Sequence, residues 1–292
     1  MPRTVAEGFN DFLYYLTPSS VESAASSRHR ASIEACLKSN FTLNRLFRTG
    51  SFGNGTSISG YSDVDYFASL GADDLSDSST YTLTNVRDAL DKRFPNTGVR
   101  VNCPAVKVPF GTAPSETTEI VPADCVAQFG NQKYLVYDIP DCAGGWMRSS
   151  PDAHNDYVRS IDNKHSGKVK PLIRFVKAWK FFKQAPISSF YLELRVAKYA
   201  DGEKDIIYAY DVQRVFDMLY QNNLADMQDP MGVSGYIHAC RTETMYDDAR
   251  SKVLTASSRA DKALEAYKKS ELKTAFEWWD LLWDGRFPTY YR

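Results

Sequence analysis

Two aspartates separated by one residue close a stretch rich in small residues, GSFGNGTSISGYSDVD, which runs from Gly50 to Asp65. On a β-strand this spacing places the side chains of Asp63 and Asp65 on one face. Carboxylates held this close repel one another, and a divalent cation relieves the repulsion. Mg²⁺ prefers oxygen ligands and is usually held by carboxylates together with substrate phosphates. The pair therefore predicts a metal site.

The start of the same stretch could bind phosphate, because eleven residues before Asp63 stand Gly50 and Ser51. A glycine lets a phosphate approach the backbone, and a hydroxyl with free N–H groups can hold its oxygens. Taken singly, a D-x-D pair is usually a solvated strand face and a Gly-Ser loop is usually a turn. The combination favours a phosphate cradle beside a metal-binding strand.

A two-metal site normally needs a third carboxylate from a neighbouring strand. The segment TTEIVPAD offers Glu119, which precedes an apolar run and should lie on a strand paired beside the D-x-D strand. Asp124 and Glu116 are the competing candidates, and an exposed strand residue is the alternative explanation for Glu119. We choose Glu119 as the third metal ligand.

The pattern of apolar residues and turn signals predicts the elements that would position these groups. The first half predicts a mixed α/β unit and the part after Pro151 predicts helices, with a boundary near residues 150–170. We expect a long helix over Val21–Lys38, a helix over 78–95, and strands over 44–50, 62–70, 98–110, 116–129 and 133–140. We expect later helices over 153–164, 168–184, 188–200, 205–223, 246–270 and 272–283.

Composition places the chain among ordinary globular proteins. It has 292 residues, is 43% hydrophobic and 24% charged, and carries a net charge of -1, which argues against a general nucleic-acid scaffold. Its five cysteines are odd in number, widely spaced and without a C-x-x-C pair, which disfavours a disulfide framework or a zinc site and fits a reducing cytosol. We see neither a signal peptide nor a membrane span, and expect a cytoplasmic protein.

The spacing of Gly50-Ser51 to Asp63-Val64-Asp65 resembles the polymerase-β nucleotidyltransferase superfamily. The longer string GSFGNGTSISGYSDVDYF is similar to the bacterial cGAS/DncV-like nucleotidyltransferases (CD-NTases), which make cyclic di- or trinucleotide signals in anti-phage (CBASS) defence. Further similar stretches are EIVPA, YDIPDCAGGWMRSSPDAHNDYV, and LIRFVKAWK followed by SSFYLELRV, so the resemblance covers about residues 45–195. One departure is Glu119, where many relatives carry Asp.

The resemblance implies an α/β (α+β) fold with a polymerase-β-like nucleotidyltransferase core built on a mixed sheet. The core would comprise residues 1–160, and a helical lobe over 161–292 would close the nucleotide cleft, the two being joined by the long N-terminal helix. It also implies an enzyme, a Mg²⁺-dependent cyclic oligonucleotide synthase, that uses two metal ions, for which Mn²⁺ can substitute. Asp63, Asp65 and Glu119 would bind these metals, and Asp63 would bridge both.

The resemblance assigns the nucleotide contacts as well. Gly50 and Ser51 would hold the β- and γ-phosphates, and Lys177 would contact the triphosphate together with Ser189. Phe190, or Tyr191 beside it, is a candidate for stacking on the donor base, with core packing as an equal alternative. Asn163 would line the acceptor-base pocket, where an asparagine favours a pyrimidine such as uracil, so UTP is a candidate substrate beside ATP, GTP and CTP.

Other functions remain open at the level of sequence. The same fold could modify a protein, a small molecule or an RNA end, or make linear oligonucleotides, and an inactive fold could serve as a nucleotide sensor. Because residues 21–38 carry no strong basic stripe, we expect activity without a nucleic-acid activator, and a protein regulator in its place. We expect a monomer that does not act at a membrane.

Overall fold

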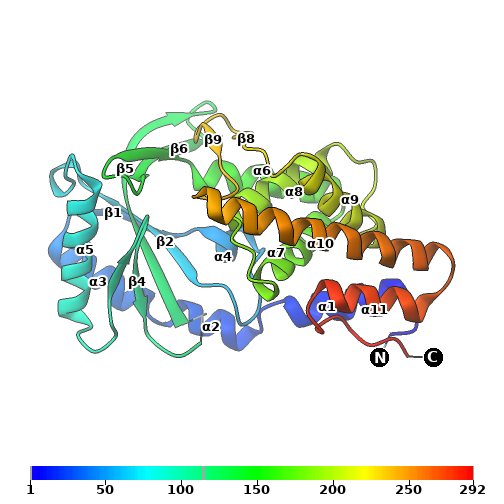
Figure 1. Cartoon of the computed structure of the whole chain (residues 1–292). Coiled ribbons are helices and arrows are strands. Elements are labelled where there is room, and N and C mark those ends of the chain that lie inside the picture. Colours follow the sequence, from blue (N-terminus) through cyan, green and yellow to red (C-terminus); the bar gives the residue numbers. More distant parts are fainter. Residues whose placement is uncertain (1, 114–115, 292) are drawn as a thin grey trace. The chain divides into compact units, whose positions relative to one another are not determined.

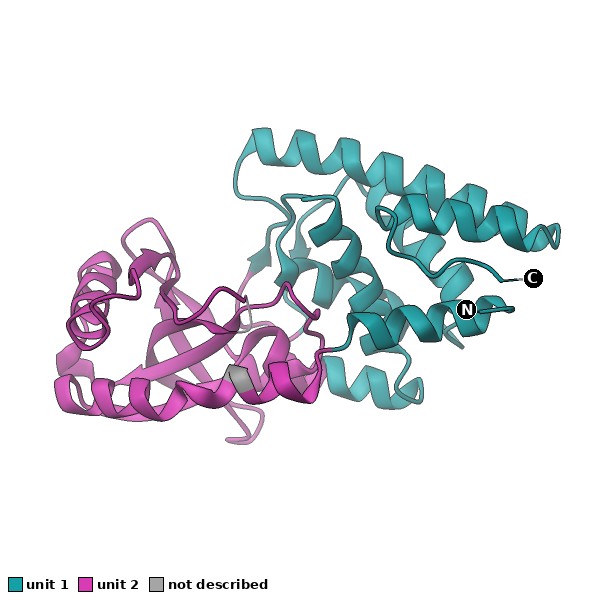
Figure 2. Cartoon of the chain, turned by 90° about the horizontal axis from the view of Figure 1, so that it is seen from below, with its two compact units in different colours: residues 1–17, 158–230, 236–292 teal, residues 18–157, 231–235 magenta. Residues whose placement is uncertain are grey.

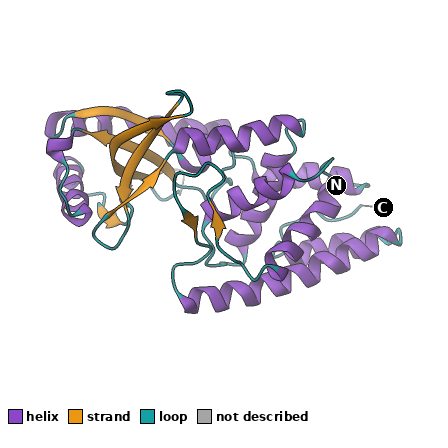
Figure 3. Cartoon of the chain, turned by 90° about the horizontal axis from the view of Figure 1, so that it is seen from above, coloured by secondary structure: helices purple, strands orange, loops and turns teal. Residues whose placement is uncertain are grey.

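The computed structural model describes residues 2–113 and 116–291, with the side chains of residues 25 and 26 left out. The chain divides into two compact units (Figure 2). The first, here called the sheet unit, comprises residues 18–157 and 231–235. The second, here called the helical unit, comprises residues 1–17, 158–230 and 236–292. Figure 3 shows the long strands gathered in the sheet unit and long helices throughout the helical unit.

The sheet unit is built on a seven-stranded mixed sheet (Figure 1). Strands β2 and β5 are parallel, and every other pairing in the sheet is antiparallel. The strand order is β1-β2-β5-β4-β3, and β6 pairs with the second half of β5 and with β7. The strands are β1 Leu43–Arg48, β2 Val64–Leu70, β3 Arg100–Asn102, β4 Ala105–Pro109, β5 Thr117–Phe129, β6 Tyr134–Pro140 and β7 Trp146–Ser149. The helices are α2 Ser20–Arg28, α3 Arg30–Asn40, α4 Gly50–Asn54, the short η1 Ala72–Asp74, α5 Ser79–Arg93 and the start of α6 Pro151–Lys164.

The two faces of this sheet differ because side chains alternate along each strand. Val64 and Tyr66 of β2, with Ile120 of β5, pack against the apolar side chains of α3 and α5 in the main core. Phe67 and Val121, one residue out of phase, belong to a separate cluster. Asp65 shares the phase of Phe67, and Glu119 shares that of Val121. The helix-covered face therefore holds the core, while the opposite face carries the charged residues.

The predicted helix over Val21–Lys38 is two helices, α2 and α3, separated at His29. The α2 segment SVESAASSR has only one valine and two alanines as apolar residues, and Val21 is exposed, so it lacks the buried apolar stripe that α3 has. α3 has such a stripe in Ile33, Cys36 and Leu37, which belong to the main core. The break follows this change in amphipathicity.

The expectation that the cysteines avoid disulfides is wrong for one pair. Cys103, in the turn between β3 and β4, is bonded to Cys142, in the loop after β6, with the Cα atoms 5.6 Å apart. The two lie 39 residues apart in sequence, and their proximity depends on the folded sheet. Cys36, Cys125 and Cys240 are free thiols.

The helical unit holds its layers together through aromatic side chains. Phe9 and Phe12 of the N-terminal helix are buried, with ring centroids 5.2 Å from Trp279 and 4.7 Å from Trp283, respectively. Trp283 also donates from Nε1 to the carbonyl oxygen of Phe175 at 2.9 Å. The elements are α1 Val5–Leu16, the end of α6, α7 Val169–Phe182, α8 Ser189–Asp201, α9 Tyr208–Gln221, α10 Glu243–Lys268 and α11 Leu272–Leu282, with the hairpin β8 Met227–Gln228 and β9 Tyr236–Ile237.

Burial of this aromatic face explains why residues 1–17 belong to the helical unit, whereas the expected catalytic core began at residue 1. The capping box of Thr4 and Glu7 starts α1, and its apolar residues then recur on one face. Among the helices that the structure describes, none is both long enough and apolar enough to cross a bilayer.

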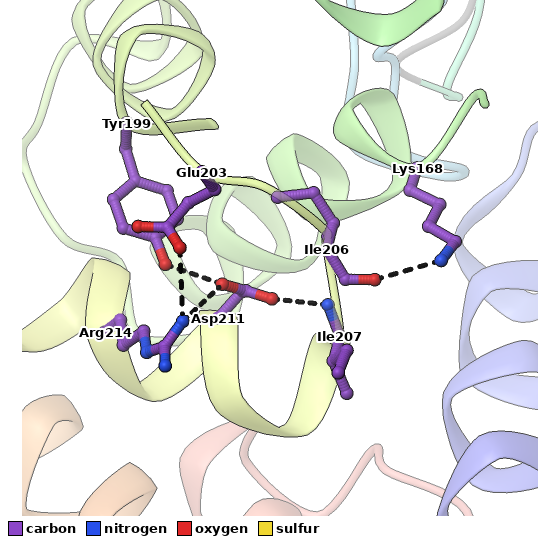
Figure 4. Close-up of polar contacts among 7 residues, drawn as sticks. All are labelled: Lys168, Tyr199, Glu203, Ile206, Ile207, Asp211 and Arg214. Atoms are coloured by element: carbon purple, nitrogen blue, oxygen red, sulfur yellow. Dashed lines mark hydrogen bonds and ion pairs between the residues drawn. The ribbon is translucent and has the colours of Figure 1, made fainter. Parts of the chain in front are cut away.

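A buried carboxylate fixes the turn between α8 and α9 (Figure 4). Asp211 is 1% exposed and accepts hydrogen bonds from the Tyr199 hydroxyl at 2.6 Å and from the Ile207 N–H at 2.5 Å. Arg214 lies 3.6 Å from the same carboxylate and also donates to Glu203. Burial and the bond to Asp211 raise the pKa of Tyr199, so this hydroxyl remains a donor. The network locks the end of α8, whose other end carries Ser189.

Candidate functional site

The close approach of Gly50 to Asp65 joins the glycine stretch to the D-x-D strand. The Thr49 N–H donates to the carbonyl oxygen of Asp65 at 2.9 Å, which places the start of α4 beside β2. A Cβ atom built on Gly50 would lie 1.9 Å from the Asp65 carboxylate oxygen, and Gly50 has a φ of 57°. Only glycine meets both conditions without strain. The packing of this carboxylate therefore requires glycine at position 50.

The rest of the stretch is a fixed loop and not a flexible one. Glu22 of α2 accepts hydrogen bonds from the Ser59 hydroxyl at 2.8 Å and from the Gly60 N–H at 2.9 Å. The Ile58 N–H donates to the Ser62 hydroxyl at 2.9 Å, and both residues are buried. Ser51 is half-buried in α4. These contacts hold the loop in one conformation from α4 to β2.

The predicted third acid lies beside the D-x-D strand. β2 and β5 pair in parallel with Asp65 opposite Glu119, which confirms the expected neighbouring strands. Asp63 directly precedes β2, two residues from Asp65, and all three carboxylates are half-buried. The structure thus brings Asp63, Asp65 and Glu119 to one face of the sheet, with Gly50 against Asp65.

A lysine that the sequence analysis did not single out lies between two of these acids. The Lys107 ammonium donates to the Asp63 carboxylate at 2.5 Å and lies 3.4 Å from the Glu119 carboxylate. The Asn102 side-chain amide donates to the same Glu119 oxygen at 2.9 Å. Burial alone would lower the pKa of Lys107, but the hydrogen bond and charge of Asp63, with the charge of Glu119, raise it. Lys107 is therefore charged throughout the physiological pH range.

The donor set suits a hard divalent cation, although the side chains are not yet gathered around one. Within residues 2–113 and 116–291, no three side chains of His, Cys, Asp or Glu lie close enough together to hold a metal ion. The carboxylates of Asp63 and Glu119 instead share the Lys107 ammonium. Oxygen donors that converge on a positive charge are the ligands that Mg²⁺ and Mn²⁺ prefer. Asp63, Asp65 and Glu119 therefore offer the kind of ligands that a Mg²⁺ or Mn²⁺ ion requires.

The predicted phosphate contact Lys177 lies in the helical unit, on α7. Its side chain is 1% exposed and donates to the Glu193 carboxylate of α8 at 3.1 Å. The ion pair resolves the cost of burying an ammonium among apolar neighbours. It also fixes α7 against α8.

Ser189, the first residue of α8, has a different partner. Lys180, one turn after Lys177, donates from its ammonium to the Ser189 hydroxyl at 2.6 Å. Burial, and next the nearby charge of Lys177, lowers the pKa of Lys180 to about 8. Because Lys177 is paired with Glu193, the ammonium of Lys180 supplies the positive charge that an anion could neutralise here.

The two residues predicted to contact bases also lie in the helical unit. Phe190 follows Ser189 on α8 and is 40% exposed. Asn163 is exposed near the end of α6, and its carbonyl oxygen accepts from the Ser166 N–H at 3.1 Å. Gly50, Ser51 and the three carboxylates belong to the sheet unit, so the nine predicted residues divide between the two units.

Sequence reasoning missed Lys107, Asn102 and Lys180. A signal for Lys107 was present in AVKVP, where a charged residue interrupts a β-branched run on the face that alternation assigns to Glu119. Lys180 could have been found by its one-turn spacing from Lys177. Asn102 gave no such signal, because its contact depends on the hairpin between β3 and β4.

Comparison with curated proteins finds distant relatives. A probable cyclic nucleotide synthase of Bacillus cereus (strain VD146) is 24% identical over 180 residues, which cover 59% of this chain and 52% of the relative. A cyclic AMP-AMP-AMP synthase of Escherichia coli (strain MS 115-1) is 25% identical over 195 residues, which cover 64% and 60%. The chain thus matches between about half and three fifths of the length of these relatives.

Among solved structures, CdnC of Escherichia coli MS115-1 with ATP has a TM-score of 0.74 and 20% identity, covering 97% of this chain and 98% of that one. At this identity the likeness concerns the fold, and it confirms the predicted α/β (α+β) architecture with a mixed sheet and a helical part. The family model described as Second Messenger Oligonucleotide or Dinucleotide Synthetase domain matches residues 3–161, more than half of the chain. This match confirms the predicted resemblance, and the chain belongs to the Second Messenger Oligonucleotide or Dinucleotide Synthetase family.

Proposed function

We propose that this protein is a divalent-metal-dependent nucleotidyltransferase that joins NTPs and closes them into a cyclic oligonucleotide. The observation that carries the proposal is the alignment of Asp65 with Glu119 on paired strands, with Asp63 on the same face. Two carboxylates placed opposite one another on adjacent strands repel unless cations lie beside them, which favours a metal site on this face. A pure nucleotide sensor would not need this set of metal ligands.

Asp63, Asp65 and Glu119 would hold the metal ions, with Mg²⁺ the expected ion and Mn²⁺ a substitute. When bound, two divalent cations would lower the pKa of the attacking ribose hydroxyl and neutralise charge on the leaving pyrophosphate. Asp65 is placed by its contact with Gly50, and Glu119 is oriented by Asn102. The role of these residues is to fix the reacting groups before the chemical step.

In each transfer, a ribose hydroxyl oxygen forms a bond to the α-phosphorus of an NTP. The bond between that phosphorus and the bridging oxygen of the β-phosphate breaks, pyrophosphate leaves, and the hydroxyl proton passes to solvent. Gly50 lets the triphosphate approach the backbone of α4, where Ser51 offers a hydroxyl. One transfer links two nucleotides, and the last transfer closes the ring.

The helical unit would contribute phosphate and base contacts. We assign the triphosphate to Lys177, Lys180 and Ser189: Lys180 offers an ammonium beside the Ser189 hydroxyl, and Lys177 would have to exchange its Glu193 partner for a phosphate. Phe190 is exposed enough to stack on the donor base. The exposed side chain of Asn163 can donate to and accept from a base edge, which keeps a pyrimidine such as uracil among the candidates.

The number of nucleotides in the ring is two or three. The relative from Escherichia coli is a cyclic AMP-AMP-AMP synthase, which favours a trinucleotide and ATP as a substrate. The product would act as a second messenger in bacterial anti-phage (CBASS) signalling. Transfer to a protein, a small molecule or an RNA end, or synthesis of linear oligonucleotides, is the alternative.

The basic residues of α2 and α3 support activation without nucleic acid. Arg30 and Lys38 both pair with Glu34, at 3.0 and 2.9 Å, and Arg28 lies 3.9 Å from Glu116. Cations that share carboxylates in this way present little net positive charge and would release few counterions from a nucleic-acid backbone. CdnC of Escherichia coli has been solved in a complex with HORMA-deltaN, and we propose a protein regulator here too, bound to a monomer. A mobility shift with double-stranded DNA or RNA at physiological salt would contradict activation without nucleic acid.

The test is a product assay with ATP, GTP, CTP and UTP, each labelled at the α-phosphate in turn, with Mg²⁺ or Mn²⁺. A product that resists phosphatase and is absent with Asp63→Asn/Asp65→Asn supports a cyclic nucleotide synthase, and mass spectrometry then gives its bases and ring size. A phosphatase-sensitive product supports linear synthesis. Label transferred to a protein or RNA supports the alternative acceptor, and no transfer to any acceptor with any NTP would overturn the proposal.

A further inference from the structure

Lys107 pairs with two of the residues to which we assign the metal, and this arrangement is part of the sheet. Lys107 on β4 is the Cα partner of Glu119 on β5, and Glu119 is in turn the partner of Asp65 on β2. Three adjacent strands therefore fix a cation and two carboxylates in one row. The backbone of Lys107 cannot leave this row without breaking the sheet, so only its side chain can move.

The contacts are close and partly shielded from water. The ammonium lies 2.5 Å from Asp63 and 3.4 Å from Glu119, and the side chains of Lys107, Asp63 and Glu119 are 19%, 28% and 18% exposed. Charge pairs in such half-buried positions interact more strongly than surface pairs, because water and salt screen them less. The pairing keeps the two carboxylates oriented toward a common point.

A divalent cation bound by Asp63 and Glu119 would require the place that the ammonium holds. Two cations in contact with the same carboxylate oxygen repel one another, and a single oxygen cannot serve both at full strength. The ammonium must therefore leave for the metal to bind. Triphosphate oxygens add negative charge at the site and favour a divalent ion over a single ammonium charge.

We propose that Lys107 is an internal counter-cation that holds Asp63 and Glu119 in place in the metal-free protein and is displaced when a divalent ion binds. The inference rests on the proposed function, and it makes Lys107 a positioning residue. Its consequence is that the site binds metal weakly alone and firmly with an NTP. The lysine thereby couples metal binding to nucleotide binding.

The test is a titration of the full-length protein with Mn²⁺ alone, with free Mn²⁺ measured by electron paramagnetic resonance. Lys107→Met should lower the Kd for Mn²⁺ by roughly fivefold or more, since it removes the competing charge. Lys107→Gln should shift the Kd in the same direction, and Lys107→Arg should stay near the wild-type value. Lys133→Met is the matched control, because Lys133 pairs with Asp156 in the same unit and touches none of the proposed metal ligands.

Thermal melting gives a second readout that does not depend on catalysis. Without metal, Lys107→Met should melt below the wild type, because its carboxylates repel one another unpaired; with Mn²⁺, its melting temperature should rise by more than that of the wild type. Equal or weaker Mn²⁺ binding by Lys107→Met, or no Mn²⁺ binding by any variant, overturns the inference. The product assay separates the two proposals: a wild type that makes product beside an unchanged Kd in Lys107→Met leaves the proposed function intact.

Discussion

The charged residues of the sheet unit and of the helical unit are held in different ways. In the sheet unit, Asp63 and Lys107 form a pair that is 28% and 19% exposed at the edge of solvent. In the helical unit, Asp211 is 1% exposed and accepts hydrogen bonds from Tyr199 and Ile207. Asp63 has one strong partner, the Lys107 side chain, which can move away. Asp211 has several partners, and they are fixed parts of the fold.

This difference in burial and partners distinguishes charged groups that bind a ligand from charged groups that stabilise the fold. A buried carboxylate is retained only when donors satisfy it, and its removal leaves those donors unpaired. Neutralising a half-buried carboxylate on an exposed face should change the unfolding free energy of the protein only a little. Substitutions of the carboxylates on the sheet face should therefore remove activity, and substitution of Asp211 should remove stability.

Asp65→Asn should give the largest effect on activity. The substitution keeps the shape beside Gly50 and removes the negative charge, so product formation should fall roughly a thousandfold while the unfolding free energy stays within about 0.5 kcal/mol. The measurements are the product assay and chemical denaturation. Asp73→Asn, an exposed aspartate of the same unit, is the control and should change neither quantity. A loss of unfolding free energy as large as that expected for Asp211→Ala would contradict the distinction between these two kinds of carboxylate.

Asp211→Ala should give the opposite pattern. The change leaves the Tyr199 hydroxyl and the Ile207 N–H without their acceptor, and the cost should be about 3 kcal/mol in the unfolding of the helical unit. Hydrogen exchange followed by mass spectrometry would localise the loss to α8 and α9. Asp217→Ala on the same helix is the matched control. Equal protection of α8 and α9 in Asp211→Ala and the wild type would contradict the structural role of this carboxylate.

Gly50→Ala tests whether activity depends on the position of the Asp65 carboxylate in the sheet unit. The new Cβ atom would lie 1.9 Å from the Asp65 carboxylate and must push it aside, so activity should fall about a hundredfold. Gly60→Ala is the control, because Gly60 has a similar positive φ but open space around its Cβ position. The two variants share the backbone strain and differ only in the contact. Equal activities of Gly50→Ala and Gly60→Ala would mean that the position of Asp65 does not matter.

Lys180 should give the smallest effect, visible as a pH dependence. Its pKa is lowered to about 8 when folded, from an ordinary value of 10.5. Between these values the unfolded chain binds a proton that the folded chain lacks, so stability rises as the pH increases from about 8 to 10.5. Lys180→Met should flatten the melting temperature across this window relative to the wild type. Lys198→Met, at an exposed position of α8, should keep the wild-type slope; a similar slope in Lys180→Met would contradict the lowered pKa.

The sequence was sufficient where local pattern decides structure. Alternation in SDVDYFASL and the β-branched run in ETTEIVPADCVAQF predicted two strands, and β2 and β5 indeed pair with Asp65 opposite Glu119. The apolar periodicity after Pro151 predicted every helix from α6 to α11. Hydrophobic spacing and turn residues act within a few positions, so one sequence contains them.

Features that depend on distant residues could not be obtained this way. The pairing of Lys107 with Asp63 joins positions 44 residues apart, and the Cys103–Cys142 bond joins positions 39 apart. To predict the break at His29, one would have to know that α2 has no apolar face to bury. The partner of Ser189 is Lys180 and that of Lys177 is Glu193, which only the packing of α7 on α8 decides.

The metal site is tested by a crystal structure with Mn²⁺ and a non-hydrolysable ATP analogue, examined by anomalous scattering. We predict Mn²⁺ coordinated by Asp63, Asp65 and Glu119 oxygens together with triphosphate oxygens, and the Lys107 ammonium moved away from Asp63. Mn²⁺ bound elsewhere, or nucleotide bound with Lys107 still paired to Asp63 and Glu119, would contradict the assignment of this sheet face as the catalytic site.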